Sequence, residues 1–201
     1  MAVQTERKRV AKRAEDRRQD ILDAAVRVLK TKGAADVTVS DITDAAGVAK
    51  GTFYLYFDSK EHLFAGLRER FVRDAIERGN SLLARVGEQD WWGLVDTSVR
   101  SFIDFHFDRV EETRLLVGEG LTPDTLKLLD ECDRALTGIF AAGIEAGVRA
   151  GAFHTDDPEM IAILLHHSLE GALEDIIVFG RDLDRERLYR VVTQTIRKVL
   201  A

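Results

Sequence analysis

The sequence predicts an all-α fold, with a small N-terminal domain followed by a larger helical one, and three observations favour this class. Apolar residues recur three and four positions apart along most of the chain, which is the spacing of one face of a helix. No segment alternates apolar and polar residues as a half-buried strand does. Both prolines among the 201 residues stand where a helical segment begins, a position that tolerates the fixed φ of proline.

The N-terminal part is expected to open with two short helices. The first runs over about residues 17–32, where the apolar positions keep helical spacing, and Gly33 ends it. Thr38 opens the second helix, because with Asp41 three residues later it fits a capping box. Gly47 then supplies a left-handed turn. Helices joined by so tight a turn are the layout of a helix-turn-helix module.

A third short helix is expected over about residues 49–56, inside the aromatic-rich stretch VAKGTFYLYFDSKEHLF, residues 48–64. At 100° per residue Phe53 and Phe57 fall on one face, so we expect them to pack against the first two helices. The residues that point away suit the major groove of DNA and the phosphates beside it. The predicted DNA contacts are Thr38, Ser40, Lys50, Gly51, Thr52, Tyr54, Leu55, Tyr56 and Lys60.

These contacts have different chemical reasons. Lys50 opens the third helix and is the best candidate for a guanine contact, whereas Leu55 can meet a thymine methyl group. Tyr54 presents its hydroxyl to a phosphate. Lys60 lies in the first turn of the next helix, where its charge and the dipole of that helix attract the same anion.

A long helix is expected to follow, because Asp58 and Glu61 form an acidic variant of the capping box and apolar residues continue at helical spacing toward Leu83. No flexible linker precedes it. We therefore expect a helix-turn-helix DNA-binding domain with a basic N-terminal arm over residues 1–58, joined rigidly to a helical effector-binding and dimerisation domain over residues 59–201. Further helices are predicted at about 91–108, then up to 117, 123–149, 158–179 and 185–200.

Charge and composition narrow the function classes. The net charge is −6, yet residues 1–73 carry 15 Lys and Arg against 11 Asp and Glu, and residues 6–18 are the densest basic run. A basic N-terminal part on an acidic body favours a polyanionic partner; the alternative for the arm is a frayed, solvated terminus. The single Cys132 excludes an internal disulfide framework and favours the cytoplasm. No apolar run approaches the ~20 residues that span a bilayer, so no membrane partner is expected.

Residues 21–64, ILDAAVRVLKTKGAADVTVSDITDAAGVAKGTFYLYFDSKEHLF, resemble the N-terminal signature of the tetracycline-repressor-like (TetR) transcriptional regulators. Helix, cap, turn and the residues from Lys50 to Lys60 fall in register, with Leu55 and Tyr56 where members often carry a polar residue or histidine. The rest of the chain is similar only in length and helical layout. The resemblance implies a homodimer that binds a palindromic DNA operator, most often as a repressor, and leaves it when a small molecule enters the C-terminal domain.

The larger domain offers candidate contacts for a partly apolar small molecule. An aromatic cluster can line a pocket, although such a stripe is more often plain core. The predicted ligand contacts are Phe102, Phe105, His106, His166 and Glu170. His166 with Glu170, and His167 with Glu170 and Glu174, have spacings that could also hold a metal ion. No third or fourth ligand is identifiable, which favours partly buried, hydrogen-bonded side chains, so we predict no metal and no cofactor. Acidic neighbours of Cys132 should raise the pKa of its thiol, which argues against redox sensing.

The segment 158–179 is apolar on more than one face, with Leu164 and Leu165 expected on the same side, and a surface helix needs only one such face. We expect the second face to meet another subunit, and its small residues to permit close approach in a four-helix interface with the last helix. The predicted interface residues are Ser168, Gly171, Ala172, Ile176, Leu188, Val192 and Thr195. The alternative is that both faces belong to the core of one subunit.

Together these features predict a dimeric, ligand-responsive transcriptional regulator, most often a repressor, without enzymatic activity. One alternative is an all-α small-molecule carrier or enzyme that uses the region of His106, His166 and Glu170. A second alternative is a DNA-binding protein that acts architecturally and has no effector.

Overall fold

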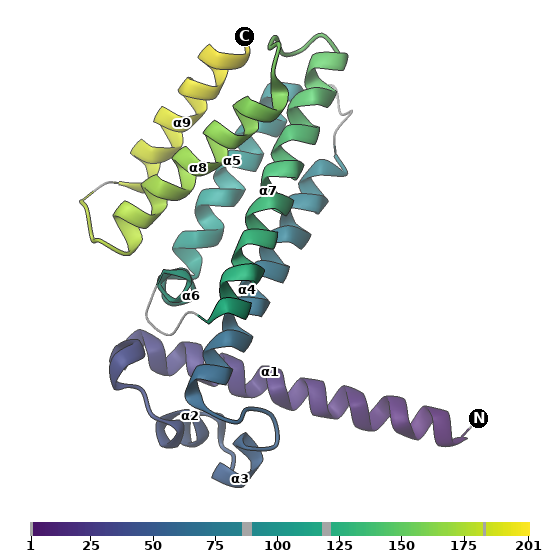
Figure 1. The fold of residues 1–201 in the computed structure, drawn as a ribbon, viewed down its shortest axis with the longest axis vertical. Coiled ribbons are helices and arrows are strands. Elements are labelled where there is room, and N and C mark those ends of the chain that lie inside the picture. The colour runs from purple at the N-terminus through teal and green to yellow at the C-terminus, as the bar shows by residue number, and fades with distance from the viewer. Residues whose placement is uncertain (1, 86–89, 118–121, 183) are drawn as a thin grey trace. The chain divides into compact units, whose positions relative to one another are not determined.

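The computed structural model describes residues 2–85, 90–117, 122–182 and 184–201, with side chains from residue 15 onward. Within these ranges the chain is helical and contains no strand, which confirms the predicted all-α class (Figure 1). None of the described helices combines the length and the apolar character needed to cross a membrane. The helices are α1 (Ala2–Asp36), α2 (Val39–Ala46), α3 (Lys50–Phe53), α4 (Lys60–Leu83), α5 (Trp91–Asp108), α6 (Val110–Leu116), α7 (Pro123–Arg149), α8 (Pro158–Ile177) and α9 (Arg185–Leu200).

The chain divides into two compact units, residues 1–69 and 70–201. The first holds α1, α2, α3 and the beginning of α4, and the second holds the remainder of α4 and all later helices. Because α4 is one continuous helix from Lys60 to Leu83, its residues belong to both units.

The core of the first unit forms where the apolar faces of its helices meet. Ile21 and Leu22 of α1, Ile42 of α2 and the rings of Phe53 and Phe57 have no exposed surface. Burying an aromatic or branched aliphatic side chain contributes about 1.5–3 kcal/mol each, so these few residues hold α1 together with α2 and α3, two short helices that would not be stable alone. The two phenylalanines are therefore core residues, as their spacing predicted.

Two helix starts differ from the sequence-based expectation, and α3 and α8 end earlier than expected, at Phe53 and Ile177. The backbone of α1 is helical from Ala2 rather than from about residue 17, and it is interrupted at Gly33, whose φ of 76° lies in the left-handed region. At the start of α4 the capping residue is Ser59 and not Asp58, because the Ser59 hydroxyl accepts a hydrogen bond from the His62 amide at 3.1 Å. The Asp58 carboxylate lies beside the His62 ring instead, at 3.4 Å.

The second unit has one large core and a smaller one. The large core lies among α5, α7, α8 and α9, with Ile103, Leu169, Leu173 and Leu200 nearly or completely buried. In Figure 1, α8 and α9 lie side by side in this unit. The smaller core gathers around Phe71 of α4 and Phe105 of α5, with Cys132 and Leu136 of α7.

Ion pairs join α5 to α9 across the large core. Arg197 of α9 donates to Asp96 of α5 at 2.9 Å, and Arg185 contacts Asp104. Arg100 of α5 contacts Glu186 at 2.9 Å. These pairs are partly exposed, so each contributes little stability, and the apolar contacts beneath them dominate.

Candidate nucleic-acid interface and ligand cavities

The turn between α2 and α3 positions the candidate DNA-binding surface. Gly47 adopts φ 65° and ψ 35°, a left-handed conformation that glycine takes without steric cost. The amide of Val48 then donates to the carbonyl of Thr43 at 3.0 Å, closing the turn. The helix α3 that follows has only four residues, continued by a turn in which the Tyr54 amide donates to the Lys50 carbonyl at 3.2 Å.

The α3 segment, which is helix α3 with the turn that continues it to Phe57, buries one side and exposes the other. The rings of Phe53 and Phe57 lie with their centroids 5.6 Å apart inside the unit. Tyr54 and Leu55, by contrast, are 54% and 79% exposed. A large apolar side chain left so open on an anchored helix indicates a surface available to a partner. The remaining predicted contacts divide between exposed (Lys50, Gly51) and half-buried (Thr52, Tyr56).

The capping box at the start of α2 engages Thr38. Its hydroxyl donates to the Asp41 carboxylate at 2.7 Å and accepts from the Asp41 amide at 3.2 Å. Lys32 donates to the same carboxylate at 2.6 Å, and these bonds, led by that of Lys32, lower the pKa of Asp41 to about 2. The hydroxyl proton of Thr38 is thus committed within the protein. Ser40 lies half-buried in the first turn of α2.

Lys60 is already tied to the end of α1. Its ammonium group donates to the Ala34 carbonyl at 3.3 Å and lies 5.7 Å from the centre of the Phe64 ring. An ammonium group has three donors, so two stay available for a phosphate. Arg27 similarly ties α1 to α2 by donating to the Ala45 carbonyl at 3.1 Å, a contact that helical spacing alone could not reveal.

The basic arm, residues 6–18, lies mostly outside the described side chains, which begin at residue 15. Of its described residues, Arg17 pairs with Asp20 at 3.2 Å, and Arg18 lies 3.5 Å from Glu69 and over the Phe57 ring. The guanidinium group of Arg18 therefore makes contacts within the first unit.

Two cavities lie in the second unit. The first, of about 140 Å³, has an almost entirely apolar wall that includes Phe102 and Phe105 of α5. The second, of about 380 Å³, is more polar and has His106 and Glu170 in its wall. The C-terminal half of α4 contributes to both, with Ala75 lining each of them.

The sequence of the chain is similar to those of known transcriptional regulators. Residues 21–67 match the family of bacterial regulatory proteins named tetR. YvdT, an HTH-type transcriptional regulator of Bacillus subtilis, is 37% identical over 78 residues, a match that spans 39% of each chain. YdgC, another regulator of this type from the same organism, is 30% identical over 166 residues, which are 81% of this chain and 82% of YdgC. The chain belongs to the tetR family of transcriptional regulators.

Solved structures of the tetR family have the same fold. A TetR-family regulator from Mesorhizobium loti superposes with a TM-score of 0.78 at 19% identity, over 92% of this chain and 96% of that one. The Bacillus subtilis regulator FadR, determined in complex with stearoyl-CoA, superposes with a TM-score of 0.70 at 20% identity, over 89% and 96%. The tetR-family assignment places the chain among transcriptional regulators, a class without enzymatic activity.

The ligand contacts predicted for this tetR-family regulator do not form one site. Phe102 and Phe105 line the apolar cavity, His106 and Glu170 line the polar one, and His166 lines neither. His166 is packed between two rings instead, with its centroid 5.8 Å from that of Phe102 and 5.3 Å from that of Phe140. Phe107, in the same stripe, is likewise absent from both walls and lies under the Arg185 guanidinium.

The sequence reasoning missed the share of α7 in the apolar cavity. Leu136, Phe140 and Ile144 line its wall, and their spacing of four residues could have revealed them as one helix face. Phe153, in the segment after α7, lines it as well.

Burial sets the protonation of two further groups around the polar cavity of the regulator. The imidazole of His106 is almost fully buried, which lowers its pKa to about 4 and keeps it neutral. Its Nδ1 lies 3.4 Å from the Thr113 hydroxyl. The pKa of the Cys132 thiol is raised to about 12, chiefly by burial and then by Glu170 and Asp133. The acidic sequence neighbours are thus the smaller cause, and the conclusion against redox sensing stands.

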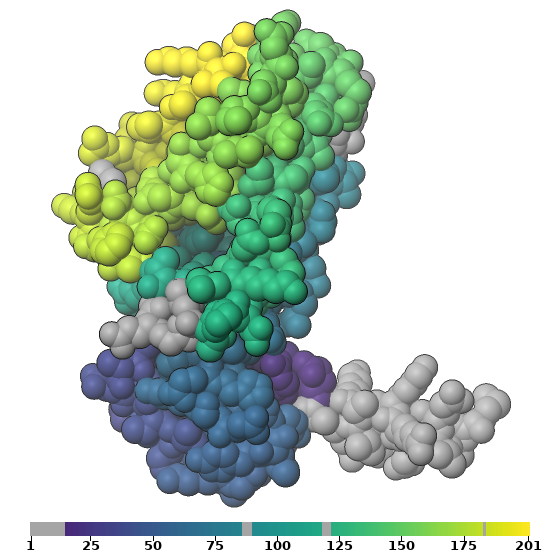
Figure 2. Space-filling view, viewed as in Figure 1, coloured from purple at the N-terminus to yellow at the C-terminus, as the bar shows by residue number. Residues whose placement is uncertain are grey.

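The candidate interface residues belong to α8 and α9, two helices that Figure 2 shows at the surface of the second unit, but Ile176, Leu188 and Val192 among them pack against the large core of the same subunit. Ser168, Gly171 and Thr195 are exposed, whereas Ala172, Ile176, Leu188 and Val192 are half-buried. Leu164, 55% exposed, does not share a face with Leu165, which packs against the large core, so the expected division of the helix was wrong at that point. Met160, Leu164, Val191 and Val199 leave large apolar side chains open on these helices.

Proposed function

We propose that this tetR-family chain is a dimeric, ligand-responsive repressor, which binds a palindromic DNA operator and is released from it by a small-molecule effector. The observation that carries the proposal is the difference between the two sides of the α3 segment. Phe53 and Phe57 anchor its inner side in the core, and its outer side presents Tyr54 and Leu55 to a partner. Acting on DNA, the protein would work in the cytoplasm.

The outer side of α3 has the chemistry of a major-groove surface. Leu55 can cover a thymine methyl group, and Lys50 at the start of the helix can donate to guanine. Tyr54 and the two free donors of Lys60 would hold the phosphates and so set the register of the helix on the duplex. The committed hydroxyl proton of Thr38 leaves this residue a weaker contact than the others.

Dimerisation would use the outer faces of α8 and α9. The open side chains of Met160 and Leu164 share one face of α8 with the small residues Ser168 and Gly171, which allow close approach of a second copy. A twofold axis through such an interface would bring two copies of α3 to two half-sites, as a palindromic operator requires. The open side chains favour this arrangement over the alternative in which both faces of α8 belong to one subunit.

An effector would occupy the apolar cavity. A cavity with this lining favours an apolar or partly apolar molecule, and the FadR of the same fold forms a complex with stearoyl-CoA. Ala75, Gly79 and Leu82 of α4 line the cavity, and the same helix begins at Lys60. Displacement of α4 by an effector is therefore a direct route to the DNA-binding residues, without a flexible linker that would absorb it.

DNA selection and effector titration test this proposal. Selection from random duplexes should enrich a palindrome, and effector binding, followed by Trp91 and Trp92 fluorescence, should weaken when operator is present. Because coupling is reciprocal, each ligand must weaken the other by the same factor, typically ~5- to 150-fold. An effector affinity that does not change with operator would contradict the release mechanism, even for a protein that binds both.

The dimer has its own test. Gly171→Arg places a charge without a partner in the packed interface and should give helical monomers with weaker operator binding. Gly138→Arg, on α7, is the matched control, since that glycine is also helical and exposed with open space at its Cβ position. A dimer that persists in the Gly171 variant by size-exclusion chromatography with light scattering would refute the assignment of the interface.

A further inference from the structure

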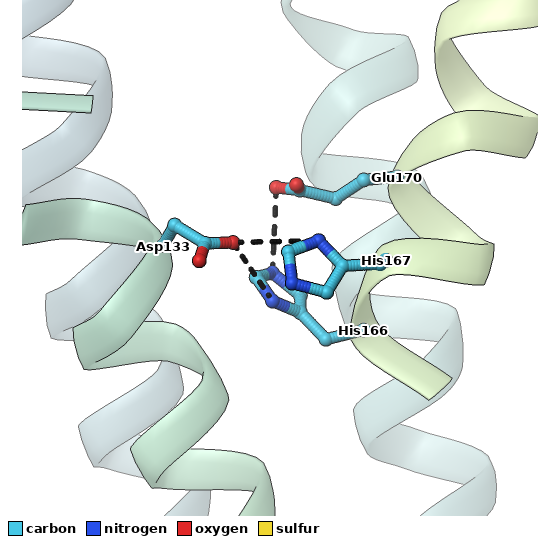
Figure 3. A group of neighbouring side chains, drawn as sticks. All are labelled: Asp133, His166, His167 and Glu170. Carbon is cyan, nitrogen blue, oxygen red and sulfur yellow. Dashed lines mark ion pairs between the residues drawn. The ribbon is translucent and has the colours of Figure 1, made fainter. Parts of the chain in front are cut away.

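Four metal-ligating side chains converge between α7 and α8. Asp133 extends from α7 toward His166, His167 and Glu170 of α8, as Figure 3 shows. One ligand atom from each residue lies within 4.8 Å of all the others. Two of the four groups are imidazoles and two are carboxylates, so the cluster differs from an ordinary surface patch of acidic residues.

His166 is the buried member, and one of its nitrogens lacks a hydrogen bond. The side chain has no exposed surface. Its Nδ1 lies 2.9 Å from the Thr137 hydroxyl, but among the described residues its buried Nε2 finds no hydrogen-bond partner. A buried polar atom without a partner is uncommon in native proteins and calls for a cause.

The nearest polar atom to this nitrogen makes the arrangement unfavourable without a cation. The Glu170 Oε1 atom lies 3.3 Å from Nε2, outside hydrogen-bonding geometry. With the proton on Nδ1, donated to Thr137, Nε2 carries a lone pair that faces a carboxylate, and two acceptors repel each other. With a proton on Nε2, in either the neutral or the charged ring, that buried N–H has only this poorly aligned carboxylate oxygen at 3.3 Å to donate to. A cation bound to the Nε2 lone pair and to Glu170 would satisfy the nitrogen and the carboxylate together.

We propose that this cluster is a binding site for a divalent transition-metal ion, with zinc as the reference ion, held by His166 Nε2, His167 Nδ1 and the carboxylates of Asp133 and Glu170. Imidazole nitrogens with carboxylate oxygens are donors that suit Zn²⁺ and its neighbours in the first transition row. Mg²⁺ and Ca²⁺ prefer oxygen ligands alone, so they should bind poorly here.

The distances fit a small adjustment around such an ion. Bonds of about 2.0–2.1 Å arranged tetrahedrally separate neighbouring ligand atoms by roughly 3.4 Å. The contact between His166 Nε2 and Glu170 is 3.3 Å, and that between His167 Nδ1 and Asp133 is 3.7 Å. The widest separation, up to 4.8 Å, would have to close by about 1.4 Å, which changes of side-chain rotamer can supply. Access is open through His167, whose side chain is 53% exposed.

Thr137 would act on the ion through His166. By accepting the Nδ1 proton it fixes the tautomer that leaves Nε2 free, which is the usual role of an outer partner of a metal-bound histidine. The sequence indicated His166, His167 and Glu170 but not Asp133 or Thr137, which precede the histidines by about thirty positions and reach them only through the packing of α7 on α8. The missing ligand is why the sequence alone predicted no metal.

The site also forms part of the wall of the polar cavity. Asp133 and Glu170 line this cavity together with Asp130 and Glu174, so its wall carries four carboxylates. An ion bound there would offset two negative charges and offer a coordination position to an anionic oxygen of a ligand. This proposal does not depend on DNA binding, since none of the four residues belongs to the first unit.

Metal binding by the full-length protein is the direct test. After treatment with a chelator and removal of any affinity tag, titration calorimetry should show one Zn²⁺ bound per chain, and Mg²⁺ at the same concentration should give no comparable heat. Bound Zn²⁺ should raise the melting temperature, because an ion that binds only the folded state stabilises it. Co²⁺ should give the visible absorption of a four-coordinate ion.

Substitutions distinguish Zn²⁺ binding at this site from nonspecific Zn²⁺ binding elsewhere on the protein. His167→Ala and Asp133→Asn should each lower Zn²⁺ affinity at least tenfold, and because these side chains are half-buried or exposed, circular dichroism should show an intact fold. Thr137→Val keeps the shape of the side chain but removes the acceptor, and should lower affinity by 10- to 100-fold. His154→Ala, an exposed histidine outside the cluster, is the control and should change nothing. Absence of Zn²⁺ binding, or binding that survives His167→Ala and Asp133→Asn, would overturn the proposal.

Discussion

Replacing Leu55 by alanine separates recognition of DNA from folding. The side chain is 79% exposed, so its loss should change the free energy of unfolding by less than about 0.5 kcal/mol. If DNA covers it, alanine forfeits up to three buried carbons at about 0.8 kcal/mol each, or about 2 kcal/mol per half-site. This corresponds to a loss of affinity of roughly 30-fold per half-site.

A thymine-to-uracil exchange in the selected operator tests the partner of Leu55. Uracil lacks only the methyl group, so it should weaken the wild-type protein by about 0.8 kcal/mol per contacted base, roughly fourfold. The Leu55→Ala variant should bind both duplexes equally, because the contact is already lost. Fluorescence anisotropy over the four combinations measures the coupling directly.

The control for this cycle is Leu126→Ala on α7. Leu126 is 53% exposed and belongs to the second unit, so the variant should fold normally and keep the fourfold preference for thymine. Phe53→Ala provides the opposite case, since the loss of a ring with no exposed surface should cost about 3–5 kcal/mol of stability. If Leu55→Ala kept the preference of the wild type, the orientation proposed for α3 on DNA would be wrong.

Two further predictions concern the edges of the same surface. Lys60→Ala should weaken binding to all DNA sequences alike and reduce the slope of log affinity against log salt concentration by about 0.9 for each phosphate contact. Lys198→Ala on α9 is the control and should change neither the affinity nor this slope. A changed sequence preference with an intact slope would contradict the phosphate role of Lys60. Thr38→Ala should cost about 1 kcal/mol in urea unfolding through loss of the cap. Asp41→Asn should lower stability at pH 7, because the pKa of Asp41 in the folded protein, about 2, lies below the ordinary value of 3.8. The loss of stability should disappear as the pH falls from about 4 through about 2. A loss that persists at pH 2 would exclude the charge of Asp41 as its cause.

Local chemistry predicted most of the fold. Capping residues and apolar spacing placed α5, α7 and α9 at their observed bounds, and Gly47 at the turn after α2. The two misplaced helix starts also have local causes. Asp58 and Ser59 compete to cap α4, and sequence pattern alone does not say which oxygen meets the amide of His62. The charged start of α1 has helix-forming residues but no apolar stripe, so periodicity could not detect it.

The sites were less predictable where they depend on packing between distant segments. Helical spacing correctly predicted that Phe53 is buried and Tyr54 exposed, because Tyr54 directly follows Phe53 at the end of α3 and a rotation of 100° per residue sets which side each faces. The aromatic stripe of α5 was expected either to line a pocket or to be plain core, yet its members face two cavities and a third environment under Arg185. Which face of α5 meets α7 and which meets α9 is determined by long-range contacts that a single sequence does not display.

The anchoring of α3 has a consequence for how such a regulator can diverge. Two buried rings hold the four-residue helix in place, while the neighbouring Leu55, which would contact a base, is 79% exposed and contributes almost nothing to folding. Leu55 can therefore be exchanged for many other side chains at little thermodynamic cost. Stability and operator preference are carried by separate residues, so a duplicated copy of this gene could acquire a new target site by substitutions that leave the folded population unchanged.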